Sequence, residues 1–174
     1  MTALFGDGDF ARLDAERRMY FPPDRNVLRA HLTLFHHLPP SCEAELVQRI
    51  REETRSTPPV ALIDGLMSLG YGVAYRVRSE GLEAVRANLA EAFTGLLIPQ
   101  DQAHWRPHVT IQNKAKPTVA KALMTKLTAE FKPRQLNIAG LALWYYRRGP
   151  WDAIAAYRFG GGGKMKTPPP LHTS

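Results

Sequence analysis

The sequence has almost no cysteine: Cys42 is the only one among 174 residues. An internal disulfide is therefore impossible, which excludes the small secreted scaffolds that depend on such bonds. Long apolar runs are also missing, because no stretch approaches the ~20 residues that a membrane-spanning helix needs. The stretch from Met1 to Phe10 has neither the basic start nor the apolar run of a signal peptide. These absences predict a cytoplasmic protein that does not act in a membrane.

Acidic residues are few compared with basic ones. The chain has 16 Asp and Glu against 23 Lys and Arg, and its formal net charge is +7. This balance suits a polyanionic partner.

One short motif occurs twice. HLTL at residues 31–34 recurs as HVTI at residues 108–111, which is an offset of 77 residues. Side chains alternate between the two faces of a strand, so each copy presents an imidazole and a hydroxyl on one face and two aliphatic side chains on the other. If the aliphatic residues anchor both strands in a core, the histidines and threonines can face one cleft.

The same offset extends beyond the motif, which indicates an internal duplication. The matching pairs are Arg29 with Arg106, Pro40 with Pro117, and Ser41 with Thr118. The segments 41–54 and 118–131 that follow both read as helices with a hydroxyl N-cap after a proline. We therefore expect one domain over residues 1–159, built from lobes at about 2–78 and 79–159.

The remaining periodicity predicts an α+β fold. Helices are expected over 9–20, 41–54, 118–131 and a segment that begins after Ser79, and strands over 2–5, 27–35, 60–68, 72–77, 105–112, 135–146 and 153–159. Short connections, such as the turns at Gly70 and at 147–150, favour mostly antiparallel sheets around a central cleft with helices outside. The Gly- and Pro-rich segment 160–174 is expected to be a flexible tail.

Paired histidines suit the cleavage of a phosphodiester. One imidazole can remove a proton from the attacking oxygen while the other protonates the departing one, and both have ordinary pKa values near neutrality. We therefore predict that His31 and His108 are catalytic, and that Thr33 and Thr110 donate hydrogen bonds to the phosphate.

Arginines and aromatic residues provide candidates for holding the rest of a substrate. Arg29 and Arg106 share the strand face of the motif histidines and can add positive charge. Aromatic rings on or near the strands can stack on a base. Of these, Tyr75 and Trp144 are the candidate platforms.

A metal site is the rival interpretation of the histidines. His36 and His37 follow the first motif, but on a straight strand His36 points away from His31, and His37 lies ~20 Å along the strand. No acidic residue lies beside either motif to complete a ligand set. We expect neither a metal nor a cofactor.

With both motifs placed on duplicated strands, the chain resembles the 2H phosphoesterase superfamily and, within it, the bacterial 2′-5′ RNA ligase-like proteins. The local sequences AHLTLFH and RPHVTIQNK carry the resemblance, which covers nearly all of residues 2–159. It implies a bilobed, pseudo-twofold fold and metal-independent attack on 2′,3′-cyclic phosphates or 2′-5′ linkages. It also implies that the two histidines are the catalytic pair and the two threonines the phosphate ligands.

The expected substrate is a small nucleotide or an RNA end, because the chain lacks long insertions that could bind an extended structured RNA. A DNA duplex is not expected as a partner, and the protein is expected to be a monomer. The alternative hypothesis is an RNA- or nucleotide-binding module with little or no turnover. The completeness of both motifs favours the enzyme.

Overall fold

The computed structural model describes residues 1–146, 151–165 and 171. Its strands are β1 (Thr2–Phe5), β2 (Leu32–Thr33), β3 (Val60–Ser68), β4 (Val73–Arg78), β5 (His108–Gln112), β6 (Arg134–Tyr146), β7 (Trp151–Arg158) and β8 (Gly163–Lys164). Its helices are α1 (Asp7–Tyr20), α2 (Glu43–Glu53), α3 (Glu80–Ala92), α4 (Pro99–Gln102) and α5 (Pro117–Glu130), with 3-10 turns at Pro23–Arg25 and Pro40–Cys42. The α+β prediction is confirmed.

Prolines and one capping serine set where the helices begin. The Ser79 hydroxyl accepts a hydrogen bond from the backbone N–H of Leu82 and caps α3, as predicted. The other two expected caps are wrong. α5 begins at Pro117, whose fixed φ suits the first helical position, so Thr118 already lies inside the helix. Ser41 lies in the 3-10 turn before α2.

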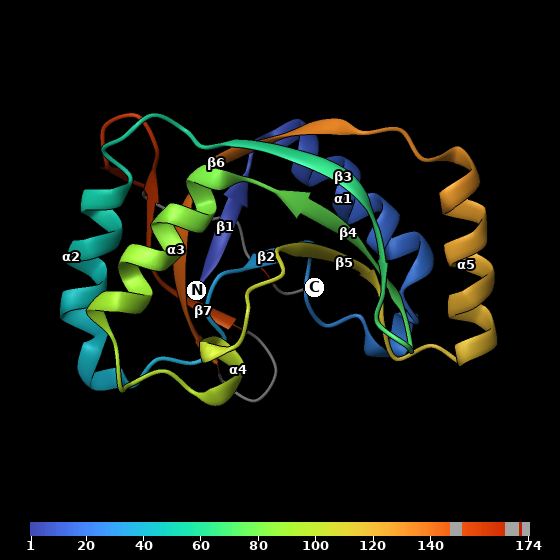
Figure 1. Cartoon of the computed structure of the whole chain (residues 1–174), viewed down its shortest axis with the longest axis horizontal. Helices are drawn as coiled ribbons and strands as arrows, with labels where there is room; N and C mark the ends of the chain where they lie inside the picture. Colours follow the sequence, from blue (N-terminus) through green and yellow to red (C-terminus); the bar gives the residue numbers. More distant parts are fainter. Residues whose placement is uncertain (147–150, 166–170, 172–174) are drawn as a thin grey trace.

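The strands pair in antiparallel fashion throughout the described part of the chain. They follow the order β1-β2-β5-β4-β3-β6-β7-β8, and β1 also pairs with β6. Six strands therefore close into a ring, and β7 and β8 extend from it beyond β6. β2 and β5 are neighbours in this ring and lie near the middle of the view in Figure 1.

The first histidine strand is much shorter than the expected 27–35. Only Leu32–Thr33 pairs as β2, because other groups occupy the backbone just before it. Arg17 Nε donates to the Leu28 carbonyl and Asp14 accepts from the Ala30 N–H. The second strand begins at His108 rather than Trp105, since Pro107 has no N–H for a ladder hydrogen bond.

In space, a helix of each sequence repeat packs on strands of the other repeat. α5, from the second repeat, packs on β3 and β4, whereas α2, from the first repeat, contacts β7. Figure 1 shows α2 and α3 on one side of the central strands and α1 and α5 on the other. The fold is bilobed, and each lobe contains elements from both sequence repeats. The boundary at residue 78 therefore separates the repeats along the sequence but not the lobes in space.

The aliphatic face of both motifs lies in the core, as predicted. Leu32, Val109 and Ile111 are each 0% exposed and Leu34 is 1% exposed. α1 covers β5 on this side. The histidines and threonines must therefore face the opposite side of the sheet, because successive side chains alternate.

The sheet continues beyond residue 159, into the segment expected to be flexible. β8 pairs with β7, and the N–H of Met165 donates to the Ala156 carbonyl. Leu171 is buried, and its carbonyl accepts from the Arg29 N–H. The expected turn at 147–150 and the rest of the tail lie outside the described residues. Within the described part of the chain, no helix is long and apolar enough to cross a membrane.

Candidate active site

The pairing of β2 with β5 brings the two motifs together. Leu32 lies directly opposite Val109 in an antiparallel register. By continuation of that register, His31 lies opposite Thr110 and Thr33 lies opposite His108, and side chains of opposite residues share one face. All four are partly exposed, in contrast to the buried aliphatic residues between them. The structure thus groups the four predicted residues on one surface.

Both histidines are held by the same contact. The Nδ1 atom of His31 lies 2.7 Å from the carbonyl oxygen of Arg29, and the Nδ1 of His108 lies 2.7 Å from that of Arg106. A carbonyl can only accept, so Nδ1 carries the proton in both hydrogen bonds. Nε2 is then the atom that exchanges protons: it accepts when the ring is neutral and donates when it is charged.

The surroundings of His31 keep it neutral. Although the residue is partly exposed, the protein packed around its ring displaces water and lowers its pKa from 6.5 to about 4, against the opposing effect of the hydrogen bond to Arg29. The positive charges of Arg17, the N-terminal ammonium and His108 lower the pKa further. At neutral pH, His31 Nε2 is therefore a free base.

Arg17 of α1 is the main site residue that the motif search missed. Its side chain is 5% exposed and donates to the carbonyl oxygens of Leu28 and Thr110 at 2.7 and 2.8 Å. Burial lowers its pKa to about 10, opposed by the charge of Asp14, so it remains positive at neutral pH. Arg17 therefore connects Leu28, in the segment just before the first motif, to Thr110 of the second motif. The available sequence signal was its spacing, because Arg17 follows Phe10 and Leu13 along the helix expected over 9–20.

Arg17 also lines a small basic cavity beside the two motifs. The cavity has a volume of about 240 Å³ and includes both His31 and Thr110. Arg25 and Lys114 contribute two more positive charges. A hydroxyl, an imidazole and several cations around one space are chemically suited to an anion such as phosphate.

The two predicted arginines have different surroundings. Arg29 Nε donates to Asp14 at 3.0 Å, and the guanidinium stacks on the Phe10 ring, so this side chain packs against α1. Arg106 is exposed and lines a different, larger cavity. The contribution that both share is the backbone carbonyl that orients the histidine two residues later.

Of the two predicted stacking platforms, Tyr75 is excluded. It is 4% exposed, its hydroxyl donates to Glu16 at 2.5 Å, and its ring packs beside Phe131 in the core. Burial, with the Glu16 contact, raises its pKa to about 12. The sequence suggested the ring because it lies on a central strand, but its position in register with Val109 places it on the core face.

Trp144 lies on the same sheet face as the motif side chains. Its Nε1 donates to the Thr2 hydroxyl at 2.8 Å, and Thr2 pairs with Thr33 across β1 and β2. Two strand spacings of ~4.8 Å separate β6 from β2. Trp144 therefore lies ~10 Å from the motif strand, in contact with the small apolar cluster of Leu4, Ala142 and Ala156.

Trp151 is a second residue that sequence reasoning missed. Its ring centroid lies 5.3 Å from that of His31, at an interplanar angle of 50°. The last strand expected from the sequence begins at 153, so Trp151 falls outside it. The structure instead places it at the start of β7.

The other histidines of the first segment do not join the motif pair. Asp101 accepts hydrogen bonds from the backbone N–H groups of His36 and His37 and from His36 Nδ1. Burial alone would raise the pKa of Asp101, but these hydrogen bonds outweigh it and lower that pKa. Within the described residues, no three His, Cys, Asp or Glu side chains are grouped to hold a metal ion.

Comparisons with known proteins agree with this architecture. The family model of the 2′-5′ RNA ligase superfamily matches residues 7–150, which include both histidine motifs. The chain is also similar to the crystal structure of TT0787 of Thermus thermophilus, with a TM-score of 0.62 and 16% sequence identity over 92% of this chain and 96% of that one. At this identity, the likeness shows the fold alone. Among curated proteins, none matches the sequence.

Proposed function

The chain belongs to the 2′-5′ RNA ligase superfamily, and on that premise we propose that it is a metal-independent phosphoesterase. Its substrates are the 2′,3′-cyclic phosphates or 2′-5′ phosphodiester bonds of RNA ends or small nucleotides. The observation that carries the proposal is the matched pair of histidines. Each is held through Nδ1 by a carbonyl, and each stands beside a threonine on one face of the sheet.

The two histidines have distinct roles in this proposal. During hydrolysis of a 2′,3′-cyclic phosphate, the Nε2 of neutral His31 takes a proton from water as the water oxygen attacks phosphorus. Protonated His108 gives its Nε2 proton to the ribose oxygen that leaves. One P–O bond forms and one breaks, and the two rings end with exchanged protonation states. The low pKa of His31 supports its assignment as the base.

The groups around the pair stabilise the charge that develops on the phosphate. Thr33 and Thr110 donate hydroxyl hydrogen bonds to the non-bridging oxygens, and Arg17 supplies a fixed positive charge beside His31 and Thr110. Because Arg17 is already held by backbone carbonyls, it needs no rearrangement as the reaction proceeds. Trp144, at the apolar side of the same face, is the proposed platform for the base.

Turnover of a small substrate panel in EDTA tests this function. The panel comprises 2′,3′-cyclic nucleotides, cyclic-ended oligonucleotides and 2′-5′ dinucleotides. We expect hydrolysis that is unaffected by the chelator. Binding of the panel without any product would instead support the binding module, and activity that disappears in EDTA would contradict the metal-independent mechanism.

A further inference from the structure

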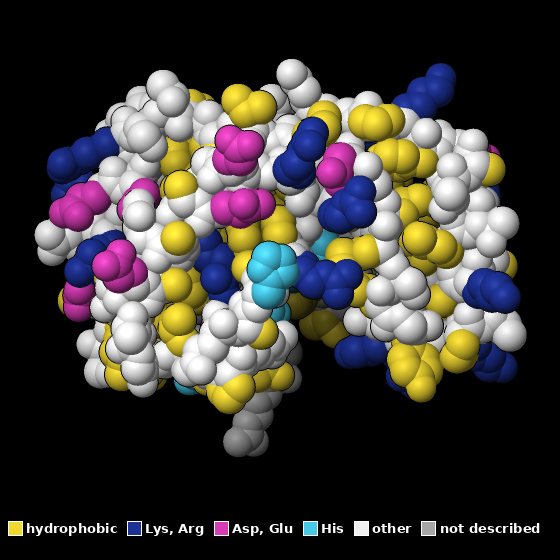
Figure 2. Space-filling model, viewed as in Figure 1, with side chains coloured by type: hydrophobic (Ala, Val, Ile, Leu, Met, Phe, Trp, Pro, Cys, Tyr) yellow, Lys and Arg dark blue, Asp and Glu magenta, His cyan; other side chains and the backbone are white. Residues whose placement is uncertain are grey.

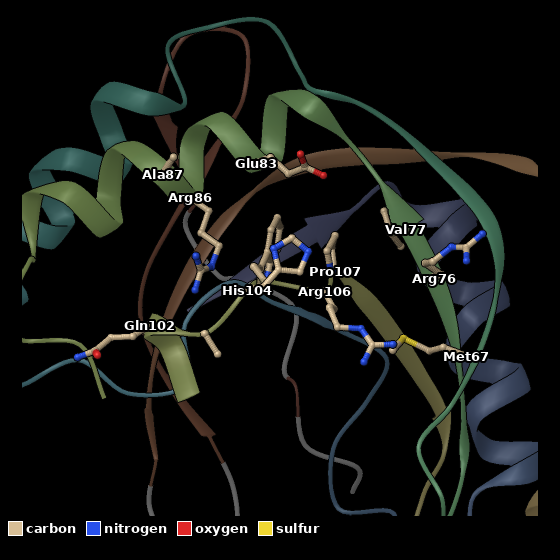
Figure 3. Close-up of a pocket in the computed structure, with 12 residues that line it drawn as sticks. Met67, Arg76, Val77, Glu83, Arg86, Ala87, Gln102, His104, Arg106 and Pro107 are labelled. Atoms are coloured by element: carbon tan, nitrogen blue, oxygen red, sulfur yellow. The ribbon is translucent and has the colours of Figure 1, made fainter. Parts of the chain in front are cut away.

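A second cavity, larger than the one beside His31, adjoins the other motif. It has a volume of about 690 Å³ and lies between α3, β4 and the segment that leads into β5. Figure 3 shows the side chains of Arg86, His104 and Arg106 close together, with Glu83 above them and Arg76 further along β4. Neither the histidine pair nor the threonines use this space.

This cavity lies next to the reactive face of the sheet. Arg76 lies directly opposite His108 in the pairing of β4 with β5, so the two side chains project from the same face, with Cβ atoms about 4.5–5.5 Å apart. Arg106 and Pro107, which immediately precede His108, also line it. A substrate whose phosphate contacts His108 can therefore extend directly into the cavity.

The lining has more basic than acidic side chains, although one of its arginines, Arg76, forms an ion pair with Asp64. Among the described residues that line the cavity, three are arginines and only Glu83 is acidic. Arg76 is fixed by Asp64 at 2.7 Å, and Arg86 is fixed by the carbonyls of Leu34 and Asp101. Arg106 is exposed. Figure 2 shows basic side chains and a histidine at the middle of this face, with acidic side chains beside them.

The opposite flank of the reactive face has a different character. There, Trp144 packs against the buried apolar side chains of Leu4, Ala142 and Ala156. A base suits the apolar flank, whereas the basic flank suits additional negative charge, because guanidinium groups bind phosphate through charge-assisted, often bidentate hydrogen bonds. A volume of about 690 Å³ leaves room for more than a single phosphate group.

We propose that the cavity lined by Arg76, Arg86 and Arg106 binds a second phosphate of the substrate, the one on the 5′ side of the nucleotide that reacts. The preferred substrate is then an RNA end rather than an isolated cyclic mononucleotide. This inference rests on the proposed function, since it takes the reacting phosphate to lie between His31 and His108.

Two substrates that differ by one phosphate test the inference. They are a nucleoside 2′,3′-cyclic phosphate with and without a 5′ phosphate. We expect the 5′ phosphate to lower KM by about 10-fold at low salt, the factor of a single charge-assisted hydrogen bond, and the advantage to shrink as salt is added. Arg106→Gln should reduce the advantage to less than about threefold, with Arg106→Lys between the two.

Arg51→Gln is the matched control, because it removes the same charge from an exposed position of α2 outside the cavity. It should keep the full advantage. Equal KM values for the two substrates in the wild-type protein would overturn the cavity inference while leaving the phosphoesterase proposal intact. If the wild-type protein turns over neither substrate, the proposed function fails. Direct binding of the 5′-phosphorylated compound then decides the inference, which requires weaker binding by Arg106→Gln than by Arg51→Gln.

Discussion

His31 and His108 each lie 2.7 Å through Nδ1 from the carbonyl of an arginine two residues earlier, yet their surroundings differ. The first ring packs against Trp151 and lies near the buried charge of Arg17. The second stands opposite Arg76, at the edge of the large basic cavity. Duplication has preserved the contact that orients each imidazole, whereas the side chains that surround each ring have diverged.

This difference is what a pair of acid and base requires. The burial and positive charge around His31 favour its neutral form, which is the form that removes a proton. Substitutions in one copy at a time therefore show whether the other copy can compensate.

Removal of either imidazole should have the largest effect. His31→Ala and His108→Ala should each lower kcat by about 10²- to 10⁴-fold, the usual contribution of a positioned acid or base. The double variant should lose little more than either single one, because the pair acts as a unit. Steady-state rates on a 2′,3′-cyclic nucleotide measure this, and full activity in one single variant would show that the copies do not act together.

The threonines should matter to rate more than to folding. Valine keeps the shape and β-branching of threonine and removes the donor, so Thr33→Val and Thr110→Val should each lower kcat by about 10- to 1000-fold. Nucleotide affinity should change much less. Melting temperatures of the variants exclude a general folding defect. Wild-type rates in both would remove the threonines from the mechanism, whereas weaker binding with no turnover to lose would favour the binding module.

The sequence could predict those parts of the fold that depend on local pattern. β3 spans Val60–Ser68 as expected, and Ser79 caps α3, because alternation and capping are written in neighbouring residues. The motif residues could be predicted for the same reason, helped by their repetition. The strand before the first motif could not, since Asp14 and Arg17 of the preceding helix fold back 11 to 16 positions along the chain and occupy its backbone groups.

Long-range placement also explains the missed and mistaken site residues. Arg17 reaches Thr110 from 93 positions away in the sequence, and the contact of Trp151 with His31 joins two ends of the chain. Tyr75 lies on the core face because it pairs with the buried Val109. That pairing depends on the register between β4 and β5, which includes an irregularity between Val73 and Ala74. No local pattern contains that information.

Trp144 should contribute to substrate affinity rather than to proton transfer. Trp144→Ala should raise KM by about 5- to 150-fold, which corresponds to the ~1–3 kcal/mol of one base stacked on an aromatic ring. Trp144→Phe keeps a ring but loses the hydrogen bond to Thr2, and should recover most of the affinity. Tyr75→Phe is the control: its ring is in the core, so KM should stay at the wild-type value. An unchanged KM in Trp144→Ala would exclude the platform.

Trp151→Ala should change kcat/KM at neutral pH least of all these variants. Its expected effect is confined to the acidic part of the pH profile. Burial is the main reason that the pKa of His31 falls to about 4, so opening the site to water should raise this pKa towards 6.5. The base must be neutral to act, and kcat/KM reports the pKa of the free enzyme, so the acidic limb of its pH profile should move to higher pH.

A higher pKa of His31 should lower activity at acidic pH much more than at neutral pH. If the pKa of His31 returned fully to 6.5, the neutral fraction would fall by roughly 30-fold at pH 5 but by less than about twofold at pH 7. A change in base stacking would alter the height of the profile and leave its midpoint in place. Trp144→Ala, which leaves the His31 contact intact, should therefore keep the acidic limb of the wild-type protein. An unmoved limb in Trp151→Ala would mean that this ring does not keep His31 neutral, and the contrast between the two motif copies would then depend on Arg17 and the remaining burial alone.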